Sequence, residues 1–190
     1  FVKAYQTVTP LKLGELWSIP IMLRLALIEN IRRVSALIAI DKVDKNLADY
    51  WAEKMIATTE KAPKNLILVI ADMARSNPPI VSAFVSELIR QLRGKGPDLG
   101  LVLNWIEQQL SGSGLTSTEM GNAENQKQAA DQVSMSNSIG SLRLRGAMDW
   151  REFVETHSIV EQTLLKDNGG IYGLMDFSTR DRYRHVVELI

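Results

Sequence analysis

The chain has 190 residues, of which 45% are hydrophobic and 23% charged, as in an ordinary globular protein and unlike a disordered one. Lys plus Arg and Asp plus Glu both number 22, so the chain lacks the basic excess of nucleic-acid-binding proteins, and no nucleic-acid partner is expected. No cysteine is present, which excludes disulfides, thiolate nucleophiles and cysteine-ligated zinc.

The first third of the chain predicts one or two long helices. Thr9 and Pro10 suit the cap and first position of a helix, and Pro20 is expected to kink or interrupt it. The polar stretch 41–46 is a candidate break between two helices. An apolar stripe at helical spacing runs on either side of this stretch, at Leu27, Ile31, Val34, Ile38, Leu47, Trp51 and Met55.

The most apolar long stretch, 19–40, has the length of a membrane span but not its composition. It contains charged residues, among them Arg24 and Glu29, and each would cost roughly 2.5–3.5 kcal/mol at the centre of a bilayer. We therefore expect a buried helix here, with no membrane span and no signal peptide in the chain. The first residue is Phe1 and not Met, which predicts a fragment of a longer protein.

The middle of the chain predicts three further helices. Six consecutive apolar residues at 66–71 suit a buried strand or a buried helix, and the helical neighbourhood favours a helix. The segments 77–79 and 94–97 predict turns, because both contain Pro and the second also contains Gly. Two amphipathic stripes follow these turns, one at Val81, Phe84, Leu88 and Leu92, the other at Leu99, Val102, Ile106 and Leu110.

The last third predicts three helices. Thr116 and Glu119 have the spacing of a capping box ahead of a helix rich in small and polar residues. Asp149 is the expected cap of the next helix, which ends at the turn 167–170. Ser178 or Thr179 is expected to begin a final helix that still runs at Ile190. One face of the second helix is aromatic and apolar, at Trp150, Phe153, His157, Val160 and Leu164.

Together these patterns predict an all-α fold, a multi-helix bundle or irregular helical array of about seven or eight helices. No hairpin signal and no internal repeat of a solenoid is present. We expect a single helical domain over 1–190, with one candidate sub-boundary near the Gly- and Ser-rich segment 111–116.

Few residues point to chemistry. Of the two histidines, His157 is expected to lie in or near the core, and no metal site is expected because the histidines are far apart in sequence. The two glycine-containing segments, within 94–97 and 111–116, do not match a phosphate-binding loop. Carboxylate pairs of the kind that glycosidases use can be drawn from Glu152, Glu155, Asp176 and Asp181, but most helical proteins offer such pairs. No catalytic residue is therefore assigned.

Two groups of charged residues are expected to form ion pairs or polar contacts. Glu29 with Arg32 and Arg33 has the spacing of a helical ion pair, expected to be partly buried and to fix helix register. The polar run 175–185 is expected either to cap a helix and dock it on 149–155, or to contact a sugar, a nucleotide or a neighbouring domain. The candidate contact residues are Trp150, Arg151, Asp176, Arg180, Asp181, Arg182, Tyr183, Arg184 and His185.

Several motifs together resemble one protein family. They are GELW at 14–17, LIEN followed by RR at 27–33, SIGSLR at 138–143, MDWREFVE at 148–155, and MDF with TRDRYRH at 175–185. The chain resembles, over nearly all its length, the N-terminal helical region that precedes the membrane glucosyltransferase part of bacterial cyclic β-1,2-glucan synthases. His157 and the turn 167–170 depart from the family pattern, where an aliphatic residue and a Pro-containing turn are usual.

The resemblance implies a parent protein of the bacterial inner membrane that makes cyclic β-1,2-glucan from UDP-glucose. It implies that the transferase and phosphorylase-like sites lie downstream, so no catalytic residue and no cofactor is carried over to this segment. The implied location is the cytoplasmic face of that membrane. The implied partners are other domains of the same polypeptide, with glucan as a further candidate.

Three hypotheses remain open at this stage. The leading one is a non-catalytic helical scaffold of the synthase; the second is a stand-alone α-helical protein-interaction module. Hydrophobic spans encoded after Ile190 would favour the first and an early stop codon the second. The third, a small glycosidase, requires two carboxylates that converge in a pocket.

Overall fold

The fold is described from a computed structural model of the chain, which covers residues 1–112 and 114–189. Within these residues the chain is 81% helical and has no strand, so the predicted all-α fold is confirmed. The described residues form nine α-helices, seven of them with seven or more residues, in agreement with the expected number.

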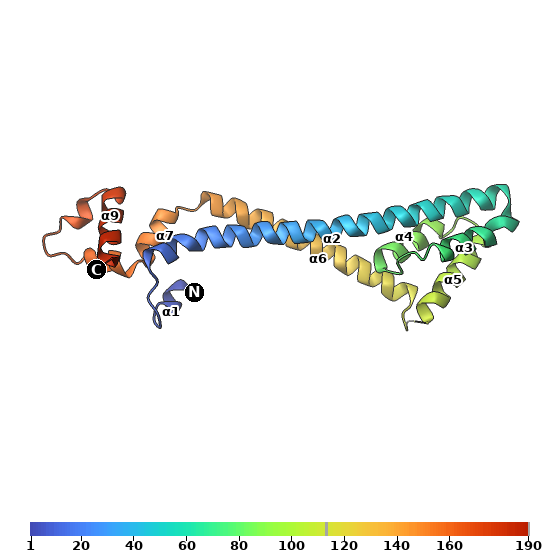
Figure 1. The fold of residues 1–190 in the computed structure, drawn as a ribbon, viewed down its shortest axis with the longest axis horizontal. Coiled ribbons are helices and arrows are strands. Elements are labelled where there is room, and N and C mark those ends of the chain that lie inside the picture. The colour runs from blue at the N-terminus through green and yellow to red at the C-terminus, as the bar shows by residue number, and fades with distance from the viewer. Residues whose placement is uncertain (113, 190) are drawn as a thin grey trace. The chain divides into compact units, whose positions relative to one another are not determined.

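The helices follow one another with short connections (Figure 1). The α-helices are α1 Val2–Tyr5, α2 Leu13–Lys61, α3 Leu66–Arg75, α4 Ser82–Leu92, α5 Gly100–Ser111, α6 Ser117–Ala147, α7 Trp150–His157, α8 Ile159–Leu164 and α9 Phe177–Glu188. Three 3₁₀ turns lie between them, η1 Pro63–Asn65, η2 Pro97–Leu99 and η3 Tyr172–Leu174.

The chain divides into two compact units. Unit 1 comprises residues 1–30 and 137–190, and unit 2 comprises residues 31–136. This division differs from the single domain expected from the sequence, and neither junction falls in 111–116, a segment whose Ser113 lies outside the described residues, as does Ile190. Because α2 and α6 run through the junctions without a break, no Gly- or Pro-rich linker marks them in the sequence.

The start of α2 differs from the prediction. The helix begins at Leu13, so the expected start at Thr9 and Pro10 is wrong. The Lys12 N–H donates to the Glu15 carboxylate at 2.8 Å, and the Leu13 N–H donates to Glu188 of α9 at 2.6 Å. These bonds supply acceptors for N–H groups that a helix start otherwise leaves unpaired, and one of them comes from a residue distant in sequence.

Once begun, α2 continues for 49 residues. Pro20 lies inside it and does not end it, and the polar stretch 41–46 is helical as well. Of the two alternatives, one long helix is therefore correct. In unit 2 two polar side chains of this stretch have partners on α6: Asp41 pairs with Lys127 at 2.5 Å and Lys45 pairs with Glu124 at 2.7 Å.

The core of unit 2 lies where α3, α4 and α5 gather at the C-terminal end of α2 (Figure 1). The predicted stripes form this core, except that Val81 lies before α4 and is 42% exposed. The choice of a helix at 66–71 is confirmed, since Leu66, Val69 and Ile70 are buried and the two residues between them are exposed. The largest side chains that are fully buried in this core are Met55, Leu66, Met73, Phe84, Leu88, Leu92, Leu99 and Leu110.

The helix α6 begins as expected from its sequence. The Thr116 N–H donates to the Glu119 carboxylate at 2.9 Å, and the Glu119 N–H donates to the Thr116 hydroxyl at 3.2 Å. The predicted capping box is thus confirmed.

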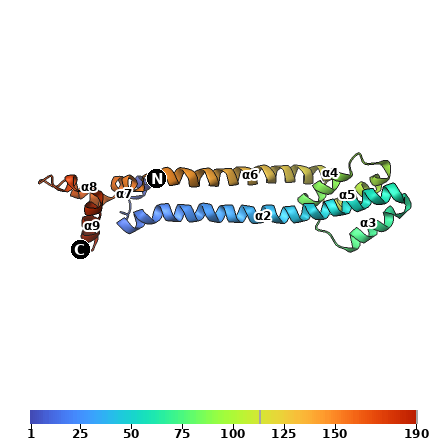
Figure 2. The same ribbon diagram turned by 90° about the horizontal axis from the view of Figure 1, so that it is seen from above.

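In unit 1 the first part of α2 and the last part of α6 run side by side in opposite directions (Figure 2). The Asn30 amide donates to the Ser138 hydroxyl at 2.8 Å across this helix pair. A small core of Leu13, Leu16 and Val154 closes the end of the pair.

The expectation of a buried helix over 19–40 is wrong for much of this stretch. Ile21, Met22, Leu25 and Ile28 are each more than half exposed, because pairing with a single helix covers only one face of α2. Glu29, Arg32 and Arg33 are also exposed, which differs from the partial burial expected for their ion pair. Pairing among these three stays a prediction. In the part of the chain that the structure describes, no helix is long and apolar enough to cross a membrane.

The C-terminal helices have boundaries that the sequence did not reveal. The stripe from Trp150 to Leu164 predicted one helix, but the chain turns at the buried Ser158, whose hydroxyl accepts the Glu161 N–H at 3.2 Å and caps α8. The last helix was expected to begin at Ser178 or Thr179. It begins at Phe177, and Asp176 is its cap. The predicted cap Asp149 of α7 is confirmed.

Candidate functional site

The densest polar contacts of the molecule surround one buried carboxylate, Glu161 at the first turn of α8. Its side chain is 1% exposed. One oxygen accepts from the Arg180 guanidinium at 2.8 Å, and the other accepts from the Arg184 guanidinium at 2.8 Å and the Tyr172 hydroxyl at 2.5 Å. Glu155 of α7 lies 2.6 Å from Arg180 and 3.5 Å from Arg184. We call these residues, Glu155, Glu161, Tyr172, Arg180 and Arg184, the Glu161 cluster.

Arg184 is the most deeply buried charge of the cluster, with a side chain that is fully inaccessible. It also donates to Asp181 at 3.0 Å, and its guanidinium lies 5.0 Å from the centre of the Phe177 ring. Burial lowers the pKa of Arg184, but its hydrogen bonds to Asp181 and Glu161 outweigh burial and raise the pKa above its ordinary value. The cation is therefore held charged inside unit 1, where it binds α9 to α7 and α8.

The cluster is well paired but not completely satisfied. The Nε–H groups of Arg180 and Arg184 are buried and have no hydrogen-bond acceptor among the described residues. An unpaired buried donor destabilises the folded state. The ion pairs between the two guanidinium groups and the carboxylates that face them must offset this cost.

Tyr172 in η3 is the aromatic member of the cluster. It is 5% exposed, and its ring meets that of Tyr183 edge to face with centroids 6.3 Å apart. Burial, together with the hydrogen bond to Glu161, raises the pKa of the Tyr172 hydroxyl well above its usual value. The phenol thus stays protonated at neutral pH and acts as a donor to Glu161.

The other predicted residues of α9 have local roles. Asp176 caps the helix by accepting the N–H groups of Ser178 at 2.9 Å and Thr179 at 3.1 Å. Hydrogen bonds from the Ser178 and Thr179 side chains, followed by those from the backbone, hold the pKa of Asp176 below its ordinary range. His185 places Nδ1 2.9 Å from the Asp181 carbonyl oxygen, and Arg182 is exposed on α9.

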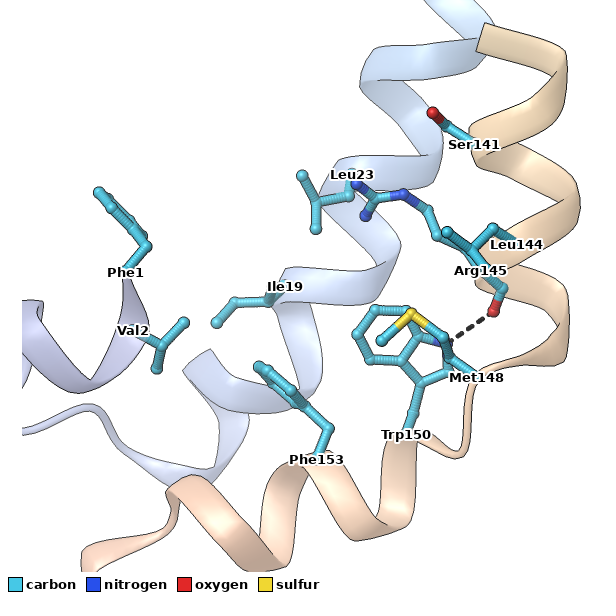
Figure 3. Close-up of a pocket in the computed structure, with 10 residues that line it drawn as sticks. All are labelled: Phe1, Val2, Ile19, Leu23, Ser141, Leu144, Arg145, Met148, Trp150 and Phe153. Carbon is cyan, nitrogen blue, oxygen red and sulfur yellow. Dashed lines mark hydrogen bonds between the residues drawn. The ribbon is translucent and has the colours of Figure 1, made fainter. Parts of the chain in front are cut away.

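Among the described residues, Trp150 and Arg151 make no hydrogen bond or ion pair to the Glu161 cluster, although Arg151 and Arg184 both lie over the Phe177 ring. Arg151 is exposed, with its guanidinium 5.4 Å from the centre of the Phe177 ring. Trp150 lines an apolar pocket of about 450 Å³, and its indole N–H donates to the Arg145 carbonyl oxygen at 3.0 Å (Figure 3). The pocket is lined by Phe1, Val2, Ile19, Leu23, Ser141, Leu144, Arg145, Met148, Trp150 and Phe153.

A second pocket of unit 1 has a volume of about 520 Å³. It is lined by Thr163, Leu164, Lys166, Asp167, Ile171, Tyr172, Met175 and Tyr183. We call it the Tyr172 pocket. Among the predicted contact residues, Tyr183 alone is part of it.

Three of the four carboxylates that could serve a glycosidase have structural partners. Glu155 and Asp181 bind arginines and Asp176 caps a helix, while Glu152 is exposed. None of the four lines either of these two pockets. The lowered pKa of Asp176 is also the opposite of what a general acid requires. Among the described residues, no group of three or more His, Asp and Glu side chains is placed to hold a metal ion.

The centre of the cluster was not expected from the sequence. Arg180 and Arg184 were candidate contact residues, but Glu161 and Tyr172 were not. A signal for Glu161 was present, because Ser158 and Glu161 have the same capping spacing as Thr116 and Glu119. Read as a helix start, that spacing would have placed Glu161 in the first turn of a short helix near the arginines.

Comparison with known proteins shows a similarity to one part of a longer protein. No family model matches the chain. It is 30% identical over 187 residues to the cyclic beta-(1,2)-glucan synthase NdvB of Rhizobium meliloti (strain 1021), a match that covers 98% of this chain and 6% of that protein. The chain is therefore similar, along nearly its whole length, to a short segment of a cyclic β-(1,2)-glucan synthase, and the family resemblance expected from its sequence is confirmed.

Proposed function

We propose that this chain is a non-catalytic helical scaffold segment of a synthase that makes cyclic β-1,2-glucan from UDP-glucose. The observation that carries the proposal is the similarity to NdvB over 98% of the chain, which leaves almost no part of this sequence unrelated to that synthase. The parent protein is an enzyme of the bacterial inner membrane in this proposal, and the segment lies on its cytoplasmic face.

The contacts of the polar residues support a structural role. The arginines of α9 bind carboxylates of α7 and α8, and the acidic residues nearby cap helices or bind these arginines. Side chains engaged in this way hold three short helices together. They are not arranged as the nucleophile, acid and base that group transfer requires.

The exposed apolar side chains of α2 support a packing surface. Ile21, Leu25 and Ile28 follow one another at steps of four and three residues and are 57%, 55% and 54% exposed, and Met22 beside them is 62% exposed. A contiguous apolar stripe of this kind is typical of a surface that packs against another protein part. In this proposal the stripe contacts other domains of the same polypeptide.

The non-catalytic part of the proposal is tested by incubating the chain with UDP-glucose and a glucan acceptor. We expect no release of UDP above the level of a heat-denatured sample. Sustained glucose transfer by the chain alone would overturn the proposal.

The scaffold part is tested in the complete gene product by the double substitution Leu25→Glu and Ile28→Glu. We expect less cyclic glucan or less intact synthase, because charges on the stripe would prevent packing, while the circular dichroism of the isolated chain stays unchanged. Ser35→Glu, an exposed position on the same helix, is the matched control. Full glucan production by the double variant would contradict the assignment of this surface.

The same stripe also favours the second candidate function, a stand-alone α-helical interaction module. The complete open reading frame distinguishes the two candidate functions. Several hydrophobic spans encoded after Ile190 would support the synthase segment, and an early stop codon would support the free module.

A further inference from the structure

The Tyr172 pocket combines an aromatic wall with a polar rim. Its volume of about 520 Å³ lies within the range of roughly 300–1,000 Å³ typical of small-molecule sites. Its apolar and aromatic lining residues are Leu164, Ile171, Tyr172, Met175 and Tyr183, and its charged groups come from Lys166 and Asp167. All of these residues belong to unit 1.

The Glu161 cluster fixes the aromatic wall in place. The Tyr172 hydroxyl donates to Glu161 at 2.5 Å, and the two arginines that bind Glu161 hold that carboxylate in turn. The orientation of the Tyr172 ring is thereby set before any ligand arrives, which reduces the entropy lost on binding. Because the Tyr172 hydroxyl donates to Glu161, only the ring of Tyr172 faces the pocket.

Tyr183 provides a second aromatic surface. It stands nearly perpendicular to Tyr172, with an interplanar angle of 88°, and is 50% exposed. Its position on α9 is fixed by the neighbouring Arg184, which the Glu161 cluster anchors. Tyr183 is thus the accessible ring of the pocket, and it rests edge to face against the nearly buried Tyr172.

The rim carries opposite charges next to each other in sequence. Lys166 and Asp167 are both exposed, and one oxygen of Asp167 accepts the Gly169 N–H at 3.1 Å, which holds the carboxylate in the turn. An ammonium donates hydrogen bonds and a carboxylate accepts them. A ligand with neighbouring hydroxyl groups can bond to both, because each hydroxyl is donor and acceptor.

A pyranose ring has the complementary chemistry, with apolar C–H groups on its faces and hydroxyl groups around its edge. We propose that the Tyr172 pocket binds a glucopyranosyl unit of a β-1,2-glucan, which packs on the exposed Tyr183 ring beside the nearly buried Tyr172 and hydrogen-bonds to Lys166 and Asp167. This inference rests on the proposed role in glucan synthesis for the identity of the sugar. It assigns a saccharide contact to a segment with no reaction of its own.

The test is a titration of the chain with linear β-1,2-linked glucooligosaccharides, followed by amide chemical shifts in nuclear magnetic resonance spectra. We expect saturable shifts confined to residues 163–183. Tyr183→Ala is expected to weaken binding at least tenfold, and Tyr183→Phe to retain most of it because the ring remains. Asp167→Asn is expected to weaken binding several-fold, because the carboxylate accepts more strongly than the amide.

The matched control is Tyr50→Ala in unit 2, which removes a tyrosine that is 54% exposed and should leave binding unchanged. Circular dichroism of each variant checks that it is folded. The absence of saturable shifts, or undiminished binding by folded Tyr183→Ala, would overturn the inference. Neither result bears on the scaffold proposal, which fails instead on glucose transfer by the chain alone or on full glucan production by the α2 double variant.

Discussion

At the scale of single residues, Glu161 has the largest structural role in unit 1. It is the acceptor for two arginines and a tyrosine that come from η3 and α9, and it is almost inaccessible to solvent. A buried carboxylate and a buried guanidinium are stable together but costly apart, because either charge alone lacks both water and a counter-ion. Glu161, which the sequence did not indicate, thus explains the positions of Arg180 and Arg184.

Glu161→Ala is expected to lower the local free energy of unfolding of α8 and α9 by about 3–5 kcal/mol, because it leaves Arg184 buried without its main partner. Glu161→Gln should lose less, since the amide oxygen still accepts a hydrogen bond. Amide hydrogen exchange in 159–188 measures both changes. Glu53→Ala, at an exposed position of α2, is the control and should change exchange by no more than about 0.5 kcal/mol. Equal effects of Glu161→Ala and Glu53→Ala would show that the cluster does not stabilise the helices.

Tyr172 makes the stability of the chain sensitive to high pH. Its pKa is raised in the folded protein by burial and by its hydrogen bond to Glu161, whereas an unfolded tyrosine titrates near about 10. The folded state therefore holds its proton more tightly, so this contribution to stability is fully present below about pH 10 and is lost as the pH rises further. Urea unfolding between about pH 9 and 11.5 should show a steeper fall in stability for the unaltered chain than for Tyr172→Phe. Tyr50→Phe should keep the steep fall; a steep fall in Tyr172→Phe as well would assign the effect to other groups.

At the scale of elements, capping decided where the helices of unit 1 begin. The start of α2 is capped in part by Glu188, which is distant in sequence, and the start of α8 is capped by the buried Ser158. Apolar periodicity continues across the turn at Ser158, which is why it predicted one helix in place of α7 and α8. Where the cap is local and its spacing distinct, as at Thr116 and Glu119, the sequence predicted the helix start correctly.

Ser158→Ala is expected to destabilise the α7–α8 corner by about 0.5–2 kcal/mol, the usual cost of losing a helix cap. The hydroxyl that accepts the Glu161 N–H is removed, so the short helix that carries Glu161 should open more often. Amide exchange in 150–164 measures this opening. Ser136→Ala, at an exposed position within α6, is the matched control. Identical exchange in the two variants would mean that the cap contributes nothing measurable.

At the scale of the whole molecule, the described residues form two hydrophobic cores and not one. The core of unit 2 contains side chains of α2 to α6, and the small core of unit 1 contains Leu13, Leu16 and Val154. Each unit therefore has its own source of stability. The helices α2 and α6 each contribute residues to both units.

Leu88→Ala and Leu16→Ala are expected to affect different parts of the chain. Both side chains are fully buried, and such truncations typically cost about 2–5 kcal/mol. Leu88→Ala should speed amide exchange in α3, α4 and α5 and leave α7 to α9 protected, and Leu16→Ala should do the reverse. Loss of protection throughout the chain in either variant would indicate a single cooperative unit.

The sequence by itself determined the helical class of this protein, most of its helices, the core stripes of unit 2 and the resemblance to glucan synthases. These depend on local signals, such as the periodicity of Leu99, Val102, Ile106 and Leu110, or on motifs that stay together along the chain. Only the tertiary structure decided the partners of Arg180 and Arg184, the start of α2, the exposure of Ile21, Leu25 and Ile28, and the Tyr172 pocket. The physical reason is that each of these depends on which distant segment lies opposite a side chain, and helical spacing shows which residues share a face but not what that face meets.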